Sequence, residues 1–263
     1  MRGYRAILSA RFRTLLQYRV AAVAGIGTQL FFGLVMAMVL EAFYRSTTTS
    51  QPMTIEEVTT YIWLGQSFLG SLPWNVDRDI HALIRSGSVS YEFLRPLDLY
   101  THWYSRVLAY RSAPTLLRAV PLLPVAALFL RMEAPSSLGA AGAFALAILG
   151  ALILSCAITT VLTVTLLWTV SGQGLVTLVA PVVMVFSGML VPLPLFPEWT
   201  QTFLSILPFR GLVDTPFRLY LGHIPPGDLL LHLAHQLAWA TAIVVFGRWL
   251  LSRGVRRLVL QGG

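Results

Sequence analysis

The sequence predicts an all-α membrane protein with six transmembrane helices, an N-terminal amphipathic interfacial helix, a short cytoplasmic helix between spans 2 and 3, and re-entrant outer helices between spans 5 and 6. Three observations predict this fold. Of the 263 residues, 56% are hydrophobic and only 11% are charged, whereas a soluble domain has about 25% charged residues. The mean hydropathy is +0.71. The apolar residues also form long runs of about 20 residues, the length that crosses a bilayer.

Six apolar runs cover residues 20–43, 58–76, 107–130, 138–167, 174–192 and 229–251. The first run is too long for a signal peptide and lacks a convincing small-residue cleavage site, so we interpret it as a retained span. We expect one transmembrane domain over the whole chain. Its three non-spanning parts are an interfacial helix at 1–19, a cytoplasmic region at 77–106 and an outer hairpin at 192–228.

Arginines predict the orientation. They are frequent before the first run, between the second and third runs and after the last run, whereas the loops after runs one and three hold only Arg45 and Arg131. We count Arg111 with the arginines between the second and third runs. Because basic loops stay in the cytoplasm, both termini and the region 77–106 are expected to be cytoplasmic, in the cell (inner) membrane. An even number of spans agrees with this placement. Topology and anionic headgroups explain the net charge of +8 better than nucleic-acid binding does.

Residues 2–19 form a basic amphipathic pattern. Apolar side chains recur at helical spacing on one side, and arginines and a serine occupy the other. Such a helix lies in the cytoplasmic headgroup layer. Two interpretations remain open: a helix that also contacts a partner, and a plain membrane anchor.

The most polar stretch, DRDIHALIRSGSVSYEFLRPLDLY at 77–100, holds four acids, three arginines and a histidine. Asp77 can cap a helix whose apolar side includes Ile80 and Ile84, and Gly87 can end it. A solvated inner loop is the alternative, but such loops rarely carry so many uncovered apolar residues. We therefore expect a short amphipathic helix presented to the cytoplasm.

The loop after the fifth run, 191–228, is rich in proline and still hydrophobic. A helix over residues 198–207 places Trp199 and Phe203 on one face, Pro208 ends it, and a second short helix follows. Two such helices fit a re-entrant hairpin in the outer leaflet. Backbone at that depth needs cover from protein or a wet cavity, so we expect the hairpin to pack against its own bundle or a partner subunit.

The amino-acid composition excludes several kinds of binding and catalytic site. All 19 basic residues are arginines, so the chain has neither a Walker A lysine for nucleotide phosphates nor a lysine that forms a Schiff base. Any ATP must be bound by another chain. The single cysteine, Cys156, allows no intrachain disulfide and no thiolate metal site.

Other polar residues have two interpretations each. His232 and His235 are spaced to share a metal, but interfacial histidines are the simpler interpretation, and we expect no metal site. Ser155, Thr159 and Thr163 of the fourth run either hold helices together or line a possible substrate path. Mid-depth ionisable residues are nearly absent, which argues against an ion-coupled transporter.

Two motifs carry a resemblance to a known family. DIHALIRSGSVSYEFLRPLDLY follows the second run, and SGMLVPLPLFPEWTQTFLSILPFRGLVDTPFRLYLG precedes the last. With these motifs, the basic amphipathic start and six runs, the chain resembles the ABC-2 type permeases, the membrane subunits of ATP-binding-cassette exporters. It is most similar to a subgroup of bacterial permeases of about this length. The resemblance spans nearly the whole chain.

The resemblance implies a permease without catalytic activity, a coupling helix at about 77–87 that docks on a separate ABC ATPase subunit, and re-entrant helices at about 197–221. ATP and Mg²⁺ belong to that ATPase, and no cofactor belongs to this chain. A second permease chain, identical or related, and membrane lipid are the other expected partners. The residues assigned to ATPase coupling are Asp77, Asp79, Ile80, Ile84, Arg85, Gly87, Tyr91, Leu94 and Arg95. Those assigned to the outer hairpin are Pro197, Trp199, Phe203, Pro208, Pro216, Arg218 and Tyr220.

Two other classes of protein remain as alternatives. One is an intramembrane serine protease, although the serine stretches at 65–70 and 186–189 lack the flanking pattern that a nucleophile and an oxyanion hole need. The other is a membrane scaffold that transports nothing. The identity of the substrate, and export against import, cannot be read from the residues.

Overall fold

The computed structural model describes residues 2–94, 96–168 and 173–261. The chain is 80% helical, and the described residues contain no strand. The α-helices are α1 (Arg2–Leu16), α2 (Arg19–Ser46), α3 (Ile55–Phe68), α4 (Arg78–Arg85), α5 (Ser90–Phe93), α6 (Leu99–Phe129), α7 (Leu138–Thr165), α8 (Gln173–Phe186), α9 (Glu198–Ile206), α10 (Asp214–Leu221) and α11 (Leu229–Gln261). The 3₁₀ turns are η1 (Leu69–Ser71), η2 (Leu193–Leu195), η3 (Pro208–Leu212) and η4 (Pro226–Asp228).

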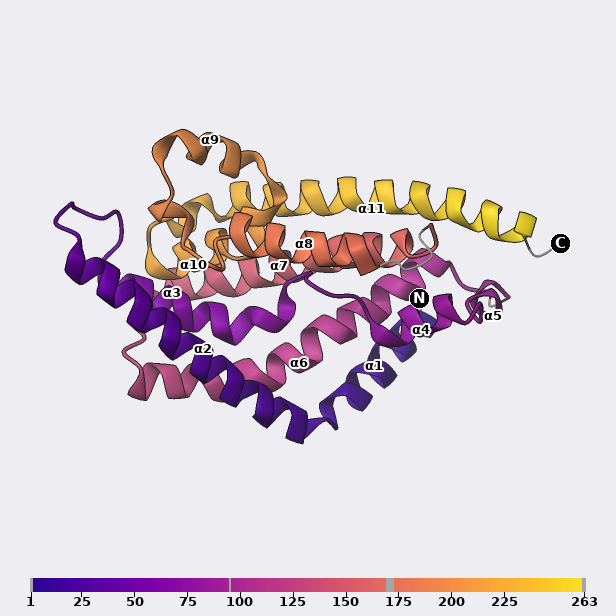
Figure 1. Ribbon diagram of the computed structural model, residues 1–263, viewed down its shortest axis with the longest axis horizontal. Helices are drawn as coiled ribbons and strands as arrows, with labels where there is room; N and C mark the ends of the chain where they lie inside the picture. The colour runs from indigo at the N-terminus through magenta and orange to yellow at the C-terminus, as the bar shows by residue number, and fades with distance from the viewer. Residues whose placement is uncertain (1, 95, 169–172, 262–263) are drawn as a thin grey trace.

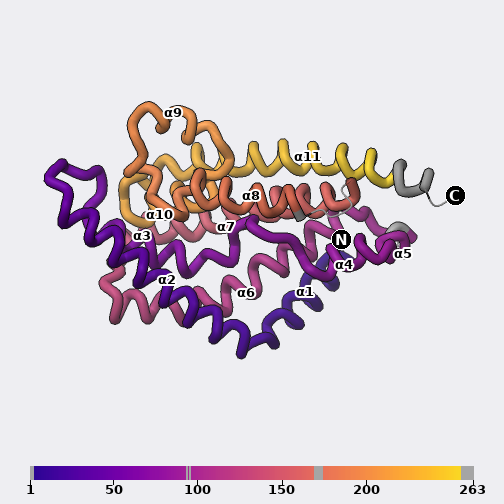
Figure 2. The backbone as a smooth tube through the Cα atoms, viewed as in Figure 1, coloured from indigo at the N-terminus to yellow at the C-terminus, as the bar shows by residue number. Residues whose placement is uncertain are grey.

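The long helices run roughly along the long axis of the molecule (Figure 1). Helix α7 is central and packs against α6, α10 and α11. Both termini lie toward the end that carries α4 and α5, whereas α9, α10 and the loop after α2 lie at the opposite end, as the backbone trace also shows (Figure 2). The molecule therefore has a polar loop region at one end and the hairpin at the other.

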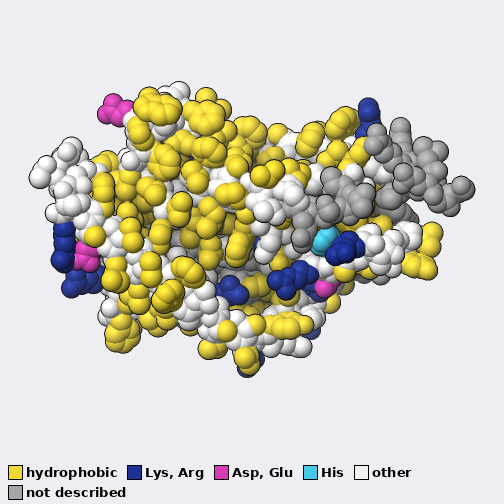
Figure 3. All heavy atoms as spheres, viewed as in Figure 1, with side chains coloured by type: hydrophobic (Ala, Val, Ile, Leu, Met, Phe, Trp, Pro, Cys, Tyr) yellow, Lys and Arg dark blue, Asp and Glu magenta, His cyan; other side chains and the backbone are white. Residues whose placement is uncertain are grey.

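Within the described residues, four helices are long and apolar enough to cross a membrane. They are α2, α6, α7 and the segment Pro226–Val255, which is mostly α11. Helices α2 and α11 leave most of their apolar side chains exposed, and hydrophobic side chains cover much of the face shown in Figure 3. Such a surface suits lipid, because apolar side chains gain nothing from facing water.

The second and fifth predicted spans form shorter helices than expected. The run 58–76 gives α3, which has 14 residues, followed by a 3₁₀ turn. The run 174–192 gives α8, also 14 residues long, with Pro181 inside it. Pro73 explains part of the difference, since the residue before a proline is disfavoured in helical conformation. The connection predicted at 171–174 lies mostly outside the described residues.

Helix α3 lies inside the bundle rather than at its surface. Trp63 and Leu64 have at most 1% of their surface exposed. The rings of Tyr61 and Phe217 meet edge to face with centroids 5.0 Å apart, which joins α3 to α10. The amide of Gln236 in α11 donates to the carbonyls of Ala147 (3.0 Å) and Gly211 (2.7 Å), so one polar side chain ties three elements together.

Candidate functional site

Local sequence determines where α4 begins and ends. The Asp77 carboxylate accepts a hydrogen bond from the Asp79 amide at 3.0 Å and caps the first turn. The helix ends at Arg85, and Gly87 follows with φ of 72°, a left-handed conformation that favours glycine. The prediction of a short helix with these two ends is confirmed.

The apolar side of α4 packs back on the bundle. Ile80 is fully buried in a cluster with Tyr100 and Trp103 of α6, Val164 of α7 and Leu251 of α11. Ile84 is partly buried against the same cluster. Within this chain, these two side chains are therefore occupied by contacts to the long helices.

The other side of α4 and α5 is free. Arg85 is exposed, and Tyr91 and Leu94 are 71% and 80% exposed. A tyrosine and a leucine this exposed at a polar end of the molecule are typical of an interface with another protein. Arg95, the remaining predicted coupling residue, lies outside the described residues.

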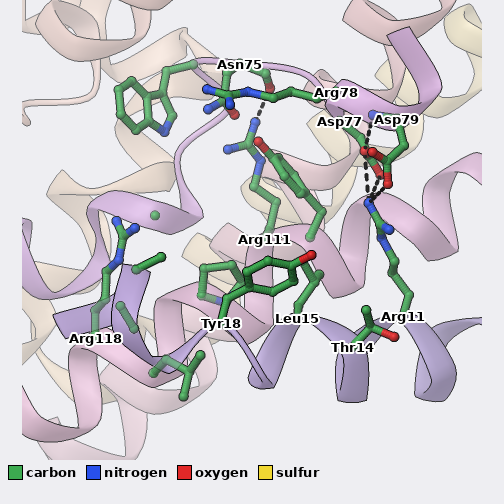
Figure 4. A pocket seen from close by; sticks show the side chains of 17 residues that line it. Arg11, Thr14, Leu15, Tyr18, Asn75, Asp77, Arg78, Asp79, Arg111 and Arg118 are labelled. Carbon is green, nitrogen blue, oxygen red and sulfur yellow. Dashed lines mark hydrogen bonds and ion pairs between the residues drawn. The ribbon is translucent and has the colours of Figure 1, made fainter. Parts of the chain in front are cut away.

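Asp77 is the centre of a set of ion pairs. Its side chain is 1% exposed, and its oxygens lie 3.1 Å from Arg11 of α1 and 3.7 Å from Arg106 of α6. Arg11 also lies 2.6 Å from Asp79 (Figure 4). Helix α1 is thus joined to the start of α4. Burial lowers the pKa of the Arg11 guanidinium, but its pairs with Asp77 and Asp79 outweigh burial and raise the pKa.

Glu92 of α5 forms a second buried set. Its side chain is 6% exposed and accepts from the Trp103 indole at 2.6 Å and from Arg106 at 3.2 Å, and His102 lies 3.6 Å away. Burial alone raises the pKa of this carboxyl, but His102, Trp103 and Arg106 outweigh burial and lower the pKa to about 2. Glu92 is therefore a stable anion that fastens α5 to α6.

Arg111 was grouped with the arginines of the inner loop, and this placement is wrong. It lies inside α6, is 1% exposed, and donates to the backbone carbonyl of Asn75 and, at 3.2 Å, to the hydroxyl of Thr159. A buried guanidinium needs such partners. Arg111 therefore connects the segment before α4 to α6 and α7.

The hydroxyls predicted to line a substrate path are engaged within the bundle. Ser155 donates to the carbonyl of Ser71, and Thr163 donates to the carbonyl of Thr159 at 2.8 Å. Ser155, Thr159 and Thr163 each have at most 1% of their surface exposed. Ser155 and Thr159 thus join α7 to other elements, whereas Thr163 bonds within its own helix, and the path stays a prediction.

The inner part of the outer hairpin is firmly packed. In α10, Pro216 and Phe217 are buried, Arg218 lies 3.7 Å from buried Asp214, and the Tyr220 hydroxyl donates to the Glu133 carbonyl at 2.8 Å. Gly222 ends this helix in a left-handed conformation. The prediction of a second short helix ending here is confirmed.

The outer part of the hairpin is not covered by its own bundle. Helix α9 follows Pro197 and ends before the buried Pro208. Trp199 is 83% exposed and Phe203 is 57% exposed, although the Phe203 ring meets that of Phe186 with centroids 6.1 Å apart. The expected packing of these two side chains against their own bundle is therefore largely absent, and cover by a partner subunit stays a prediction.

His232 and His235 are near the start of α11. His235 lies 3.3 Å from the backbone carbonyl of Ile206. Among the described residues, no group of three histidine, cysteine or acidic side chains could hold a metal ion.

The family model described as ABC-2 family transporter protein matches residues 30–262. The chain belongs to this family. The match runs from within α2 to the end of the chain and includes both motifs that carried the resemblance, which is therefore confirmed. Neither the curated proteins nor the solved structures gave a match.

Membership fixes the general role of this ABC-2 transporter protein. It is a multi-pass membrane component of a transporter. Members of the family typically lack catalytic activity of their own and work with ATPase subunits. At its polar end, this member of the family has two buried clusters of charged side chains, one around Asp77 and one around Glu92. The same end carries the exposed side of α4 and α5.

Proposed function

We propose that this chain is the permease subunit of an ATP-driven exporter, a single transmembrane domain that forms the substrate path and is coupled to a separate ATPase subunit. Four spans are the long apolar helices, and α3 and α8 complete six. Both termini, α4 and α5 face the cytoplasm of the cell, in agreement with the arginine distribution. Export and not import is the direction that the family resemblance favours.

One observation carries this proposal: α4 is fixed to the bundle on one side and free on the other. Ile80 anchors it to the long helices, and Arg11 and Arg106 hold Asp77 at its start. Arg85, Tyr91 and Leu94 remain exposed. A motion of a docked ATPase would therefore move α1 and α6 together with α4, which is what coupling requires.

The exposed face of α9 fits a second permease chain. Trp199 and Phe203 are large apolar side chains that their own bundle leaves open. Aromatic side chains of this kind are frequent anchors at interfaces. A second permease, identical or related, would cover them and complete the outer end of the path.

The test uses the double variant Arg85→Ala/Tyr91→Ala in the full chain, expressed with its cognate ATPase. Both side chains are exposed, so the helices should insert and fold as in the parent. We expect the amount of ATPase that co-purifies to fall about tenfold or more, because two central interface residues are lost. Transport in proteoliposomes should fall with it.

Arg45→Ala is the matched control, since Arg45 is an exposed arginine at the opposite end of the molecule. The control should retain the ATPase. If Arg85→Ala/Tyr91→Ala retains the ATPase and transports like the parent, α4 is not the docking helix.

A further inference from the structure

A cavity of about 580 Å³ lies between α1, the segment 70–79 and α6 (Figure 4). This volume is typical of a small-molecule site. Its charged wall residues come from all three elements: Arg11, Arg78, Arg111, Arg118, Asp77 and Asp79. Four arginines against two aspartates leave the cavity with a net positive charge.

Both aspartates already form ion pairs with Arg11. Arg11 pairs with Asp77 at 3.1 Å and with Asp79 at 2.6 Å. Among the described residues, no carboxylate lies within ion-pair distance of the remaining three arginines, Arg78, Arg111 and Arg118. The described part of the chain therefore leaves the charges of these three arginines without a carboxylate partner.

Three buried polar atoms in the same wall lack hydrogen-bond partners among the described residues, and the first is the Nε of Arg11. The Nε of Arg118 has none, and this side chain lies against Gly25 of α2, inside a helix long enough to span the membrane. The side-chain oxygen of Asn75 has none either. An unpaired guanidinium at membrane depth is costly, and such residues are usually paired or face a wet cavity. The site thus has donors for an anion and an acceptor for a hydroxyl or ammonium group beside it.

We propose that this cavity binds the headgroup of an anionic phospholipid from the leaflet that α1 borders. The phosphate lies between Arg78, Arg111 and Arg118, since guanidinium groups bind phosphate oxygens through paired hydrogen bonds. Leu15 and Leu117, also on the wall, contact the start of the acyl chains. The amphipathic helix places this opening at headgroup depth.

Such a lipid would bridge two helices. Arg11 and Leu15 belong to α1, and Arg111 and Arg118 belong to α6. The proposal is independent of transport and of ATPase docking. The sequence of α1 left two roles open, a plain membrane anchor and a helix that also contacts a partner. The proposal makes α1 a membrane anchor that binds one specific class of lipid.

The test measures the thermal stability of the full chain in detergent while phosphatidylglycerol, phosphatidylcholine or inorganic phosphate is added. We expect phosphatidylglycerol to raise the melting temperature and phosphatidylcholine to have little effect. Because each cationic side chain contributes about fivefold to binding an anionic lipid, Arg78→Gln should weaken the titration about fivefold. Arg78→Gln/Arg118→Gln should weaken it more than about twentyfold.

Arg45→Gln is the control, and it should titrate like the parent. Arg78 is exposed, so its single variant decides the result even if replacing Arg118 disturbs folding. Equal effects of the two lipids, or an unchanged titration in the Arg78 variant, would overturn the proposal. If inorganic phosphate alone stabilises the chain and displaces the lipid, the site binds a free anion, and the lipid assignment is wrong.

Discussion

Replacing Glu92 with Gln should destabilise the end of the bundle that carries α4 and α5. The pKa of the Glu92 carboxyl is about 2 in the folded chain, against an ordinary value of 4.5. Because the folded-state pKa is the lower one, the stabilisation is fully present above about pH 4.5 and is lost as the pH falls toward 2. The difference of about 2.5 pKa units corresponds to about 3 kcal/mol. Solvent reaches part of this site, so we expect about 2 kcal/mol.

The assay is the melting temperature of the full chain in detergent near pH 7 and near pH 3. For a chain of this length, about 2 kcal/mol corresponds to a melting temperature about 4–8 °C lower near pH 7. Near pH 3 the gap between Glu92→Gln and the parent should narrow, because the parent carboxyl no longer gains as much from ionisation on folding. Glu56→Gln, which changes an exposed carboxylate in the first turn of α3, should lie within about 0.5 kcal/mol of the parent at both values. A gap that is absent near pH 7, or equally large near pH 3, would refute the reasoning.

Three further predictions concern partners and topology. Trp199→Ala/Phe203→Ala should impair assembly with a second permease or transport while the ATPase still docks; free access of aqueous labels to both positions in the intact complex would contradict this. Single cysteines introduced into a Cys156→Ser background should be labelled from outside near residues 50, 134 and 210 and from inside near 5, 88 and 258. Labelling of residue 88 from outside would invert the topology. The purified chain, which has no lysine, should neither bind nor hydrolyse ATP, as equilibrium binding and phosphate release would measure.

The start and end of a helix could be predicted from the sequence where the apolar run is about as long as the helix. The starts and ends of α2 and α7 lie within three residues of the predicted runs, because these helices are apolar along most of their length. Hydropathy could not show where α3 ends, since the residues after Phe68 are still apolar. The backbone there is interrupted by Gly70 and Pro73, which hydropathy does not register.

The local features of the polar end were also predictable, whereas its contacts were not. Asp77 caps the first turn of α4 and Gly87 follows its last turn, so a few neighbouring residues are enough to predict both roles. The partner of Asp77 is 66 residues away in α1, and no periodic pattern connects the two. Arg111 was misassigned for a related reason: an arginine near a helix start looks like a topology signal until its buried partners are known.

Arg106 pairs with the buried carboxylates of Asp77 and Glu92, and this arrangement suits the transmission of force. Arg106 of α6 lies 3.7 Å from Asp77 and 3.2 Å from Glu92, so α4 and α5 are joined to one point on one helix. Leaving a buried charge without its partner costs about 3–5 kcal/mol, which opposes separation of either element from α6. Apolar contacts alone could slide, whereas ion pairs and the indole hydrogen bond of Trp103 fix direction as well as distance. A partner that displaces the exposed side of α4 must therefore move α6 with it, and α6 lies against α7 at the centre of the bundle.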